Sequence, residues 1–137
     1  MARGFSARET GLPSKVAFDK AYSLGEKAHE GQFRKDGVTP YFEHVKNVID
    51  GVEGWEAKMV AALHDTLEDT KLTAEEMRAA GIPQNVIDGV KAMTKPKGMP
   101  YLDYIRDIVL KNPLARQVKL ADIKANLSDS PNERQIK

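Results

Sequence analysis

The chain has 137 residues, of which 41% are hydrophobic and 30% are charged, as expected for one globular domain with its own core. A net charge of +1 gives no electrostatic basis for binding nucleic acid or an anionic membrane, and the absence of cysteine excludes disulfides and zinc–thiolate sites. No apolar run approaches the roughly 20 residues that span a bilayer. We therefore predict a cytoplasmic protein without a signal peptide or membrane segment.

Helical periodicity dominates the chain after its first residues. We expect residues 1–12 to form a flexible leader and residues 13–137 to form the domain. Because no segment shows the alternation typical of a strand, we predict an all-α, compact bundle of about six or seven helices. Apolar residues at helical spacing predict helices over residues 14–30, 41–51, 55–68, 74–80, 83–93, 101–111 and 113–129.

The third predicted helix ends in His64-Asp65-Thr66-Leu67-Glu68-Asp69, a concentration of groups that bind metals or carry protons. An adjacent histidine and aspartate offer a nitrogen and an oxygen ligand to a divalent cation. On a continuous helix, residues four apart share one face, so Glu68 would lie over His64 and Asp69 over Asp65. An ordinary acidic helix end is the alternative interpretation, which this stretch alone does not exclude.

Two further residues on other helices have the chemistry of metal ligands. His44 lies in the helix before the His64-Asp65 pair, and Asp122 lies at the inner edge of the last helix. Taken singly, His44 is more typical of a hydrogen-bonded structural histidine, and Asp122 of a carboxylate paired with Lys119. Together, two imidazoles and two carboxylates on separate helices form a mixed nitrogen and oxygen set that suits manganese or iron better than structural zinc.

These residues fall in three segments that resemble the HD phosphohydrolase superfamily. Within it, the chain looks most like the hydrolase domain of the RelA/SpoT-type alarmone enzymes and their small single-domain relatives. The resemblance runs from about residue 15 to residue 130. Its three segments are residues 28–37 (AHEGQFRKDG) with 40–44 (PYFEH), residues 63–70 (LHDTLEDT), and residues 118–122 (VKLAD) with Asn126.

The resemblance implies a fold and a set of site residues. It implies an HD-domain bundle and a divalent metal, typically Mn²⁺, held by His44, His64, Asp65 and Asp122. Glu68 and Asp69 match the acidic pair that orients and activates the attacking water. Four residues match positions of the nucleotide pocket: Arg34, Lys35, Tyr41 and Asn126. His29 is expected to be structural or to support the metal site indirectly.

The implied activity is hydrolysis of a guanine nucleotide. The preferred substrate is guanosine 3′,5′-bis(diphosphate), which would lose its 3′-pyrophosphate in a manganese-dependent reaction. No nucleic-acid or membrane partner is expected, and self-association into a homo-oligomer is left open. This activity would place the protein in the stringent response.

The sequence departs from the family pattern around the expected pocket. Val38 and Thr39 lengthen the loop, Ile123 replaces a common arginine, and Asp129 replaces a small hydroxyl residue. These changes keep two alternatives open. One is hydrolysis of another phosphorylated nucleotide or dinucleotide, and the other is a non-catalytic nucleotide-binding or regulatory module that retains the metal site.

Overall fold

A computed structural model of the chain describes residues 14–129, and the leader predicted for residues 1–12 lies outside them. The prediction of an all-α fold is confirmed: among the described residues, β-type pairing is confined to one isolated bridge between Phe33 and Pro40. The elements are α2 (Ser14–Ala28), α3 (Tyr41–Asp50), α4 (Trp55–Leu63), α5 (Thr66–Asp69), α6 (Ala74–Ala79), α7 (Gln84–Ala92), α8 (Tyr101–Tyr104), the π-helical turn η1 (Ile105–Val109) and α9 (Pro113–Asp129).

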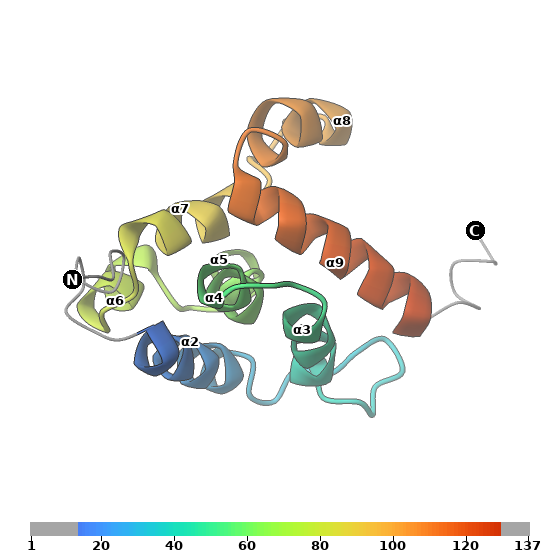
Figure 1. Cartoon of the computed structure of the whole chain (residues 1–137). Coiled ribbons are helices and arrows are strands. Elements are labelled where there is room, and N and C mark those ends of the chain that lie inside the picture. The colour runs from blue at the N-terminus through green and yellow to red at the C-terminus, as the bar shows by residue number, and fades with distance from the viewer. Residues whose placement is uncertain (1–13, 130–137) are drawn as a thin grey trace.

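Helix α4 is the centre of the fold, and α2, α3, α7 and α9 pack around it (Figure 1). A helix that is apolar on every face is suited to such a fully buried position. The buried residues of α4 are Ala57, Met59, Val60, Ala61, Ala62 and Leu63. The end of α4, where the His64-Asp65 pair follows, is therefore held inside the bundle.

The prediction of one continuous helix over residues 55–68 is wrong, because the chain turns at His64 and Asp65. Asp65 has φ −107° and ψ 3°, which lies outside the α-helical region and separates α4 from the short α5. The Thr66 hydroxyl donates a hydrogen bond to the Leu63 carbonyl at 2.8 Å, and this bond supports the turn. The histidine and aspartate therefore stand at a junction of two helices rather than on one helical face.

The helix predicted for residues 101–111 also differs in detail from the prediction. It consists of α8 followed by η1, where the Leu110 amide donates to the Ile105 carbonyl at 2.9 Å. A bond across five residues is the mark of a π-helical turn. This segment lies beyond α9, away from the central helix (Figure 1).

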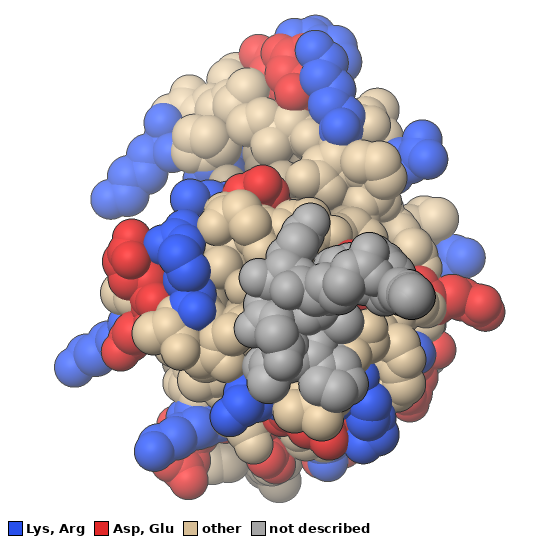
Figure 2. Space-filling view, turned by 60° about the vertical axis from the view of Figure 1, so that its left-hand side comes forward, with Lys and Arg blue, Asp and Glu red and all other residues tan. Residues whose placement is uncertain are grey.

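The surface carries both signs of charge. On the face shown in Figure 2, basic and acidic side chains of the described residues are interspersed, in agreement with the net charge of +1. Among residues 14–129, none of the helices is long and apolar enough to cross a membrane.

The contact between α2 and α4 depends on a glycine and generates a test of the fold. A Cβ atom on Gly25 would lie 2.3 Å from the backbone oxygen of Ala62, so one helix would have to move. Alanine favours a helix over glycine by about 1 kcal/mol, but overpacking a core costs about 1–3 kcal/mol. We expect Gly25→Ala to lower the free energy of unfolding, measured by urea denaturation.

The control for this prediction is Ser23→Ala, an exposed position in the same helix. It changes helix propensity without introducing a steric clash, so we expect stability equal to or slightly above that of the wild type. A Gly25→Ala protein as stable as the Ser23→Ala protein would contradict the close approach of α2 and α4.

Candidate metal centre

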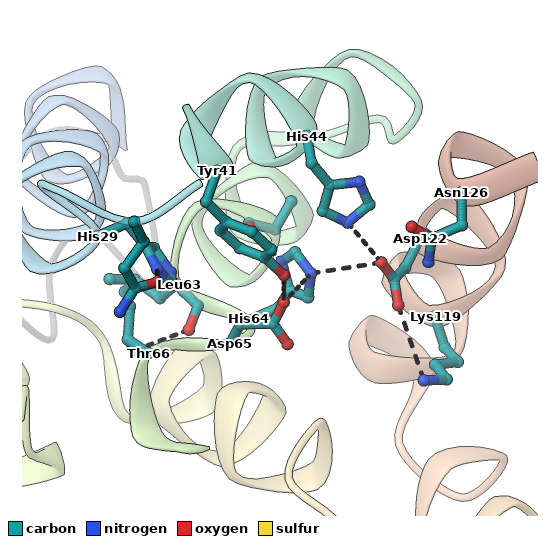
Figure 3. A network of polar contacts seen from close by, with 12 residues as sticks. His29, Tyr41, His44, Leu63, His64, Asp65, Thr66, Lys119, Asp122 and Asn126 are labelled. Atoms are coloured by element: carbon teal, nitrogen blue, oxygen red, sulfur yellow. Dashed lines mark hydrogen bonds and ion pairs between the residues drawn. The ribbon is translucent and has the colours of Figure 1, made fainter. Parts of the chain in front are cut away.

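Side chains from three parts of the bundle converge on one point (Figure 3). His44 comes from α3, His64 and Asp65 from the α4–α5 junction, and Asp122 from α9. The ligand atoms of His44, His64 and Asp65 all lie within 4.8 Å of one another. Asp122 joins them through its Oδ1 atom, which is 2.8 Å from His44 Nε2 and 3.5 Å from His64 Nε2. The structure thus brings together all four residues that the sequence predicts as ligands, and their metal-binding role stays a prediction.

The orientation of the His64 ring is fixed by the backbone. Its Nδ1–H donates to the Ala61 carbonyl at 2.7 Å, so the other ring nitrogen faces the cluster. That atom, Nε2, is fully buried and has no hydrogen-bond partner of suitable geometry among the described residues. It lies 3.2 Å from Asp65 Oδ2 and 3.5 Å from Asp122 Oδ1. A nitrogen lone pair that faces two carboxylate oxygens is unfavourable unless a positive charge lies between them.

The electrostatics of the cluster lead to the same requirement for a positive charge. Burial disfavours the imidazolium form of His64, but the carboxylates of Asp65 and Asp122 outweigh burial and raise the pKa of His64 to about 10. Burial acts to raise the pKa of Asp65, yet the charge of His64 lowers it to about 2. Burial likewise opposes ionisation of Asp122, but hydrogen bonds with His44 and His64 hold its pKa well below the usual range. The arrangement thus favours two anionic carboxylates with a cation between them.

The residues at this point fit a divalent metal. Two imidazoles and two carboxylates are the ligands that mid-series divalent ions accept, and such ions take water or phosphate oxygen at their remaining positions. Lys119, the ordinary partner considered for Asp122 from the sequence, lies with its Nζ 3.7 Å from Asp122 Oδ2. That oxygen is the one that does not contact the histidines, so the contact with Lys119 leaves Oδ1 facing the cluster.

Glu68 and Asp69, the predicted catalytic pair, lie exposed on α5. Partial burial, followed by the charges of Asp69 and Asp65, raises the pKa of Glu68 above its ordinary value. Burial and the charge of Asp65 raise the pKa of Asp69 in the same way. Although the helix is broken at Asp65, the Asp69 amide donates to the Asp65 carbonyl at 3.0 Å, which keeps the pair one turn from the cluster.

The predicted nucleotide-pocket residues are linked in part. Arg34 Nη2 donates to Asn126 Oδ1 at 3.1 Å, and the Arg34 guanidinium lies 5.7 Å from the centre of the Tyr41 ring. Lys35 is exposed beside Arg34. The structure therefore connects Tyr41 and Asn126 through Arg34 beside the metal cluster, and their contact with substrate stays a prediction. Ile123 is 41% exposed on α9, whereas the side chain of Asp129 lies outside what the structure describes.

Three contacts, made by Tyr41 and Gln32, were not predicted from the sequence. The Tyr41 hydroxyl donates a hydrogen bond to Asp65 Oδ2, and burial together with the Asp65 charge raises the pKa of Tyr41 so that this hydroxyl stays protonated. Gln32 connects the buried His29 with α5: its Oε1 is 2.8 Å from His29 Nδ1, and its Nε2 donates to the Asp69 carbonyl at 3.0 Å. The only feature of the sequence that could have indicated a role for Gln32 is its place between His29 and Arg34, in a segment that resembles the family.

Comparison with known proteins identifies related sequences, although no protein-family model matches the chain. The guanosine-3′,5′-bis(diphosphate) 3′-pyrophosphohydrolase MESH1 of Xenopus tropicalis is 33% identical over 121 residues, covering 80% of this chain and 67% of that protein. The guanosine-3′,5′-bis(diphosphate) 3′-pyrophosphohydrolase of Haemophilus influenzae is 38% identical over 81 residues, covering 54% of this chain. The GTP pyrophosphokinase of Streptomyces coelicolor is 32% identical over 120 residues, covering 80% of this chain. The chain spans only 12% and 14% of these last two proteins.

A solved structure is similar to most of the chain. It is that of a metazoan orthologue of SpoT, described as hydrolysing ppGpp and playing a role in starvation responses. The TM-score is 0.70 at 29% identity, and the match covers 83% of this chain and 70% of that chain. Fold and site together define a helical domain with an HD-type histidine–carboxylate cluster. The chain belongs to the RelA/SpoT-type hydrolase family of the HD-domain superfamily.

The convergence of carboxylates predicts how the protein responds to metal. A ligand that binds only the folded state stabilises that state by about 2.7 kcal/mol when its free concentration is 100 times its Kd. Mn²⁺ should therefore raise the melting temperature of the wild-type protein. Asp122→Asn keeps the side-chain shape but removes the charge, and we expect it to abolish most of this increase. Thermal unfolding with and without Mn²⁺ measures the effect. The control is Asp88→Asn on the exposed side of α7, and an undiminished response in Asp122→Asn would exclude Asp122 as a ligand.

Proposed function

We propose that the protein is a manganese-dependent phosphohydrolase that removes pyrophosphate from the 3′ position of guanosine 3′,5′-bis(diphosphate). The observation that carries this proposal is the convergence of His44, His64, Asp65 and Asp122 in a member of this hydrolase family. The names of the Xenopus and Haemophilus relatives support the choice of substrate.

The metal would be held by His44, His64, Asp65 and Asp122. A divalent cation bound there would lower the pKa of a coordinated water and offset charge on the phosphate under attack. The protein contributes a rigid set of donors from α3, the α4–α5 junction and α9, so that binding requires little rearrangement. The low pKa of Asp65 keeps this carboxylate in the ionised form that binds metal. The Nδ1–H bond of His64 aims Nε2 at the cluster, and metal binding would release the proton that the raised pKa of His64 keeps there.

Glu68 and Asp69 are the proposed acid–base pair. One carboxylate takes the proton of the attacking water while the water oxygen bonds to the phosphorus attached at the 3′ oxygen. The bond between that phosphorus and the 3′ oxygen breaks, pyrophosphate leaves, and a proton returns to the nucleotide oxygen. The raised pKa values of Glu68 and Asp69 suit proton transfer near neutral pH better than those of ordinary carboxylates.

The nucleotide would bind beside the cluster, against Arg34, Lys35, Tyr41 and Asn126. A guanidinium can stack on a base or form two parallel hydrogen bonds with a phosphate, whereas a lysine supplies a point charge. The bond between Arg34 and Asn126 joins the loop before α3 to α9, so the two elements would form one wall of the pocket. Turnover of this nucleotide would place the protein in the cytoplasm and in the stringent response, and self-association into a homo-oligomer stays open.

Two alternatives remain: hydrolysis of another phosphorylated nucleotide, and a nucleotide-binding module without turnover. The exposed Ile123 on α9 favours both over the main proposal, because a positive charge common in the family is absent from that part of the expected pocket. A screen of nucleotides with Mn²⁺, in which phosphate and pyrophosphate are measured separately, distinguishes these possibilities. Release of pyrophosphate from guanosine 3′,5′-bis(diphosphate) supports the main proposal, and tight binding without product supports the module.

Glu68→Gln tests the proposed chemistry. The amide keeps the shape of the side chain but cannot accept the proton, and general acid–base catalysis contributes typically 10²–10⁴-fold. We expect kcat to fall by about that factor while the Mn²⁺-induced thermal stabilisation persists, measured by pyrophosphate release and thermal unfolding. Glu75→Gln, which changes an exposed carboxylate on α6, should leave both unchanged. Full activity in Glu68→Gln would remove Glu68 from the mechanism.

A further inference from the structure

Tyr41 occupies a fixed position between the metal cluster and the nucleotide side of the site. It is the first residue of α3 and lies one turn before His44 on that helix. Its ring centre is 4.9 Å from that of His29 and 5.6 Å from that of His44, and the Arg34 guanidinium lies on the ring 5.7 Å from its centre. Aromatic and cationic neighbours on several sides restrict the directions in which the hydroxyl can point.

The hydroxyl of Tyr41 donates to Asp65 Oδ2 (Figure 3). This oxygen is also the Asp65 atom that lies 3.2 Å from His64 Nε2, so it faces the cluster. Asp65 stands at the junction of α4 and α5, and within the described residues its side chain makes no capping bond to α5. The hydrogen bond from Tyr41 therefore selects the rotamer in which the carboxylate points at the histidines.

We infer that Tyr41 is a positioning residue for the metal site, whose hydroxyl holds the Asp65 carboxylate in its metal-binding orientation. The inference rests on the proposed function and changes one part of it, because the sequence assigned Tyr41 to the substrate pocket. With its hydroxyl committed to Asp65, Tyr41 offers the nucleotide side only the ring that supports Arg34. Helix α3 would then supply both a ligand, His44, and the hydroxyl that orients a second ligand, Asp65, at the α4–α5 junction.

The direction in which metal affinity changes after loss of the Tyr41 hydroxyl distinguishes a positioning role from a purely electrostatic one. A hydrogen bond to a carboxylate lowers its basicity, so removal of the hydroxyl alone would make Asp65 a slightly better electron donor to the metal. Loss of an orienting hydrogen bond acts in the opposite direction, because groups that orient metal ligands typically contribute 10–100-fold to metal affinity or activity. A weaker metal site after loss of the hydroxyl is thus the specific signature of positioning.

The experiment is Tyr41→Phe, with Mn²⁺ affinity measured by electron paramagnetic resonance and stability measured by thermal unfolding of the metal-free protein. We expect the Kd for Mn²⁺ to rise about 10–100-fold, while the metal-free protein still unfolds cooperatively, at a somewhat lower temperature because one hydrogen bond to a carboxylate is lost. The matched control is Tyr22→Phe, which removes the hydroxyl of a ring packed on Phe18 and Phe42. The control should bind Mn²⁺ as the wild type does.

Three other outcomes would overturn the inference. An unchanged or lower Kd for Mn²⁺ in Tyr41→Phe, together with a raised KM for the nucleotide, would return Tyr41 to the substrate pocket and leave the proposed function intact. An equal loss of affinity in Tyr22→Phe would show a general effect of losing a tyrosine hydroxyl. A wild-type protein that binds no Mn²⁺ would overturn the metal-dependent function itself, and this inference with it.

Discussion

The approach of two carboxylates to one buried imidazole nitrogen is the constraint on which the site depends. His64 cannot turn away, because its Nδ1–H is bonded to the Ala61 carbonyl of the most buried helix. Its Nε2 must therefore face Asp65 and Asp122, and these oxygens require a positive charge beside them. A proton meets this requirement in the metal-free protein, and a divalent cation would meet it with better use of all four donors. The apolar surface of α4 makes this arrangement possible, because it excludes water that would otherwise screen the charges.

Helical periodicity was sufficient to predict the fold class and most of the helices, because the long helices α2, α3, α7 and α9 each bury an apolar face against α4. It failed at His64 and Asp65 for a physical reason. A turn made by a single residue outside the helical region leaves the spacing of apolar residues on either side nearly unchanged, so Leu63 and Leu67 still match a continuous helix. The π-helical turn at Ile105–Val109 was also not predicted, because Tyr101, Ile105 and Ile108 still stand at the spacing typical of an α-helix.

In the candidate site, the sequence predicted the ligand residues but not the hydrogen bonds that surround them. His44, His64, Asp65 and Asp122 could be identified as candidate ligands, because few residue types bind divalent metals. The bonds from Tyr41 to Asp65 and from Gln32 to the Asp69 carbonyl could not be predicted, because each joins groups whose proximity depends on the packing of α2, α3 and the α4–α5 junction. Hydroxyl and amide groups of this kind have many permitted partners, so residue type alone does not identify the one that is used.

The positions of the groups divide the site into a rigid part and an adaptable part. The proposed metal donors His44, His64 and Asp65 are buried or half-buried on elements that pack directly on the core, so a substitution that moved them would disturb the packing around them. The proposed catalytic and nucleotide-binding groups lie on the exposed α5, on the loop before α3 and on the outer turns of α9. Substitutions there, such as the exposed Ile123, would alter the chemistry offered to a nucleotide without changing a proposed metal ligand. If the proposed nucleotide contacts hold, a change of substrate would require few changes in the core, and the loop around Arg34 together with α9 near Ile123 and Asn126 would set specificity.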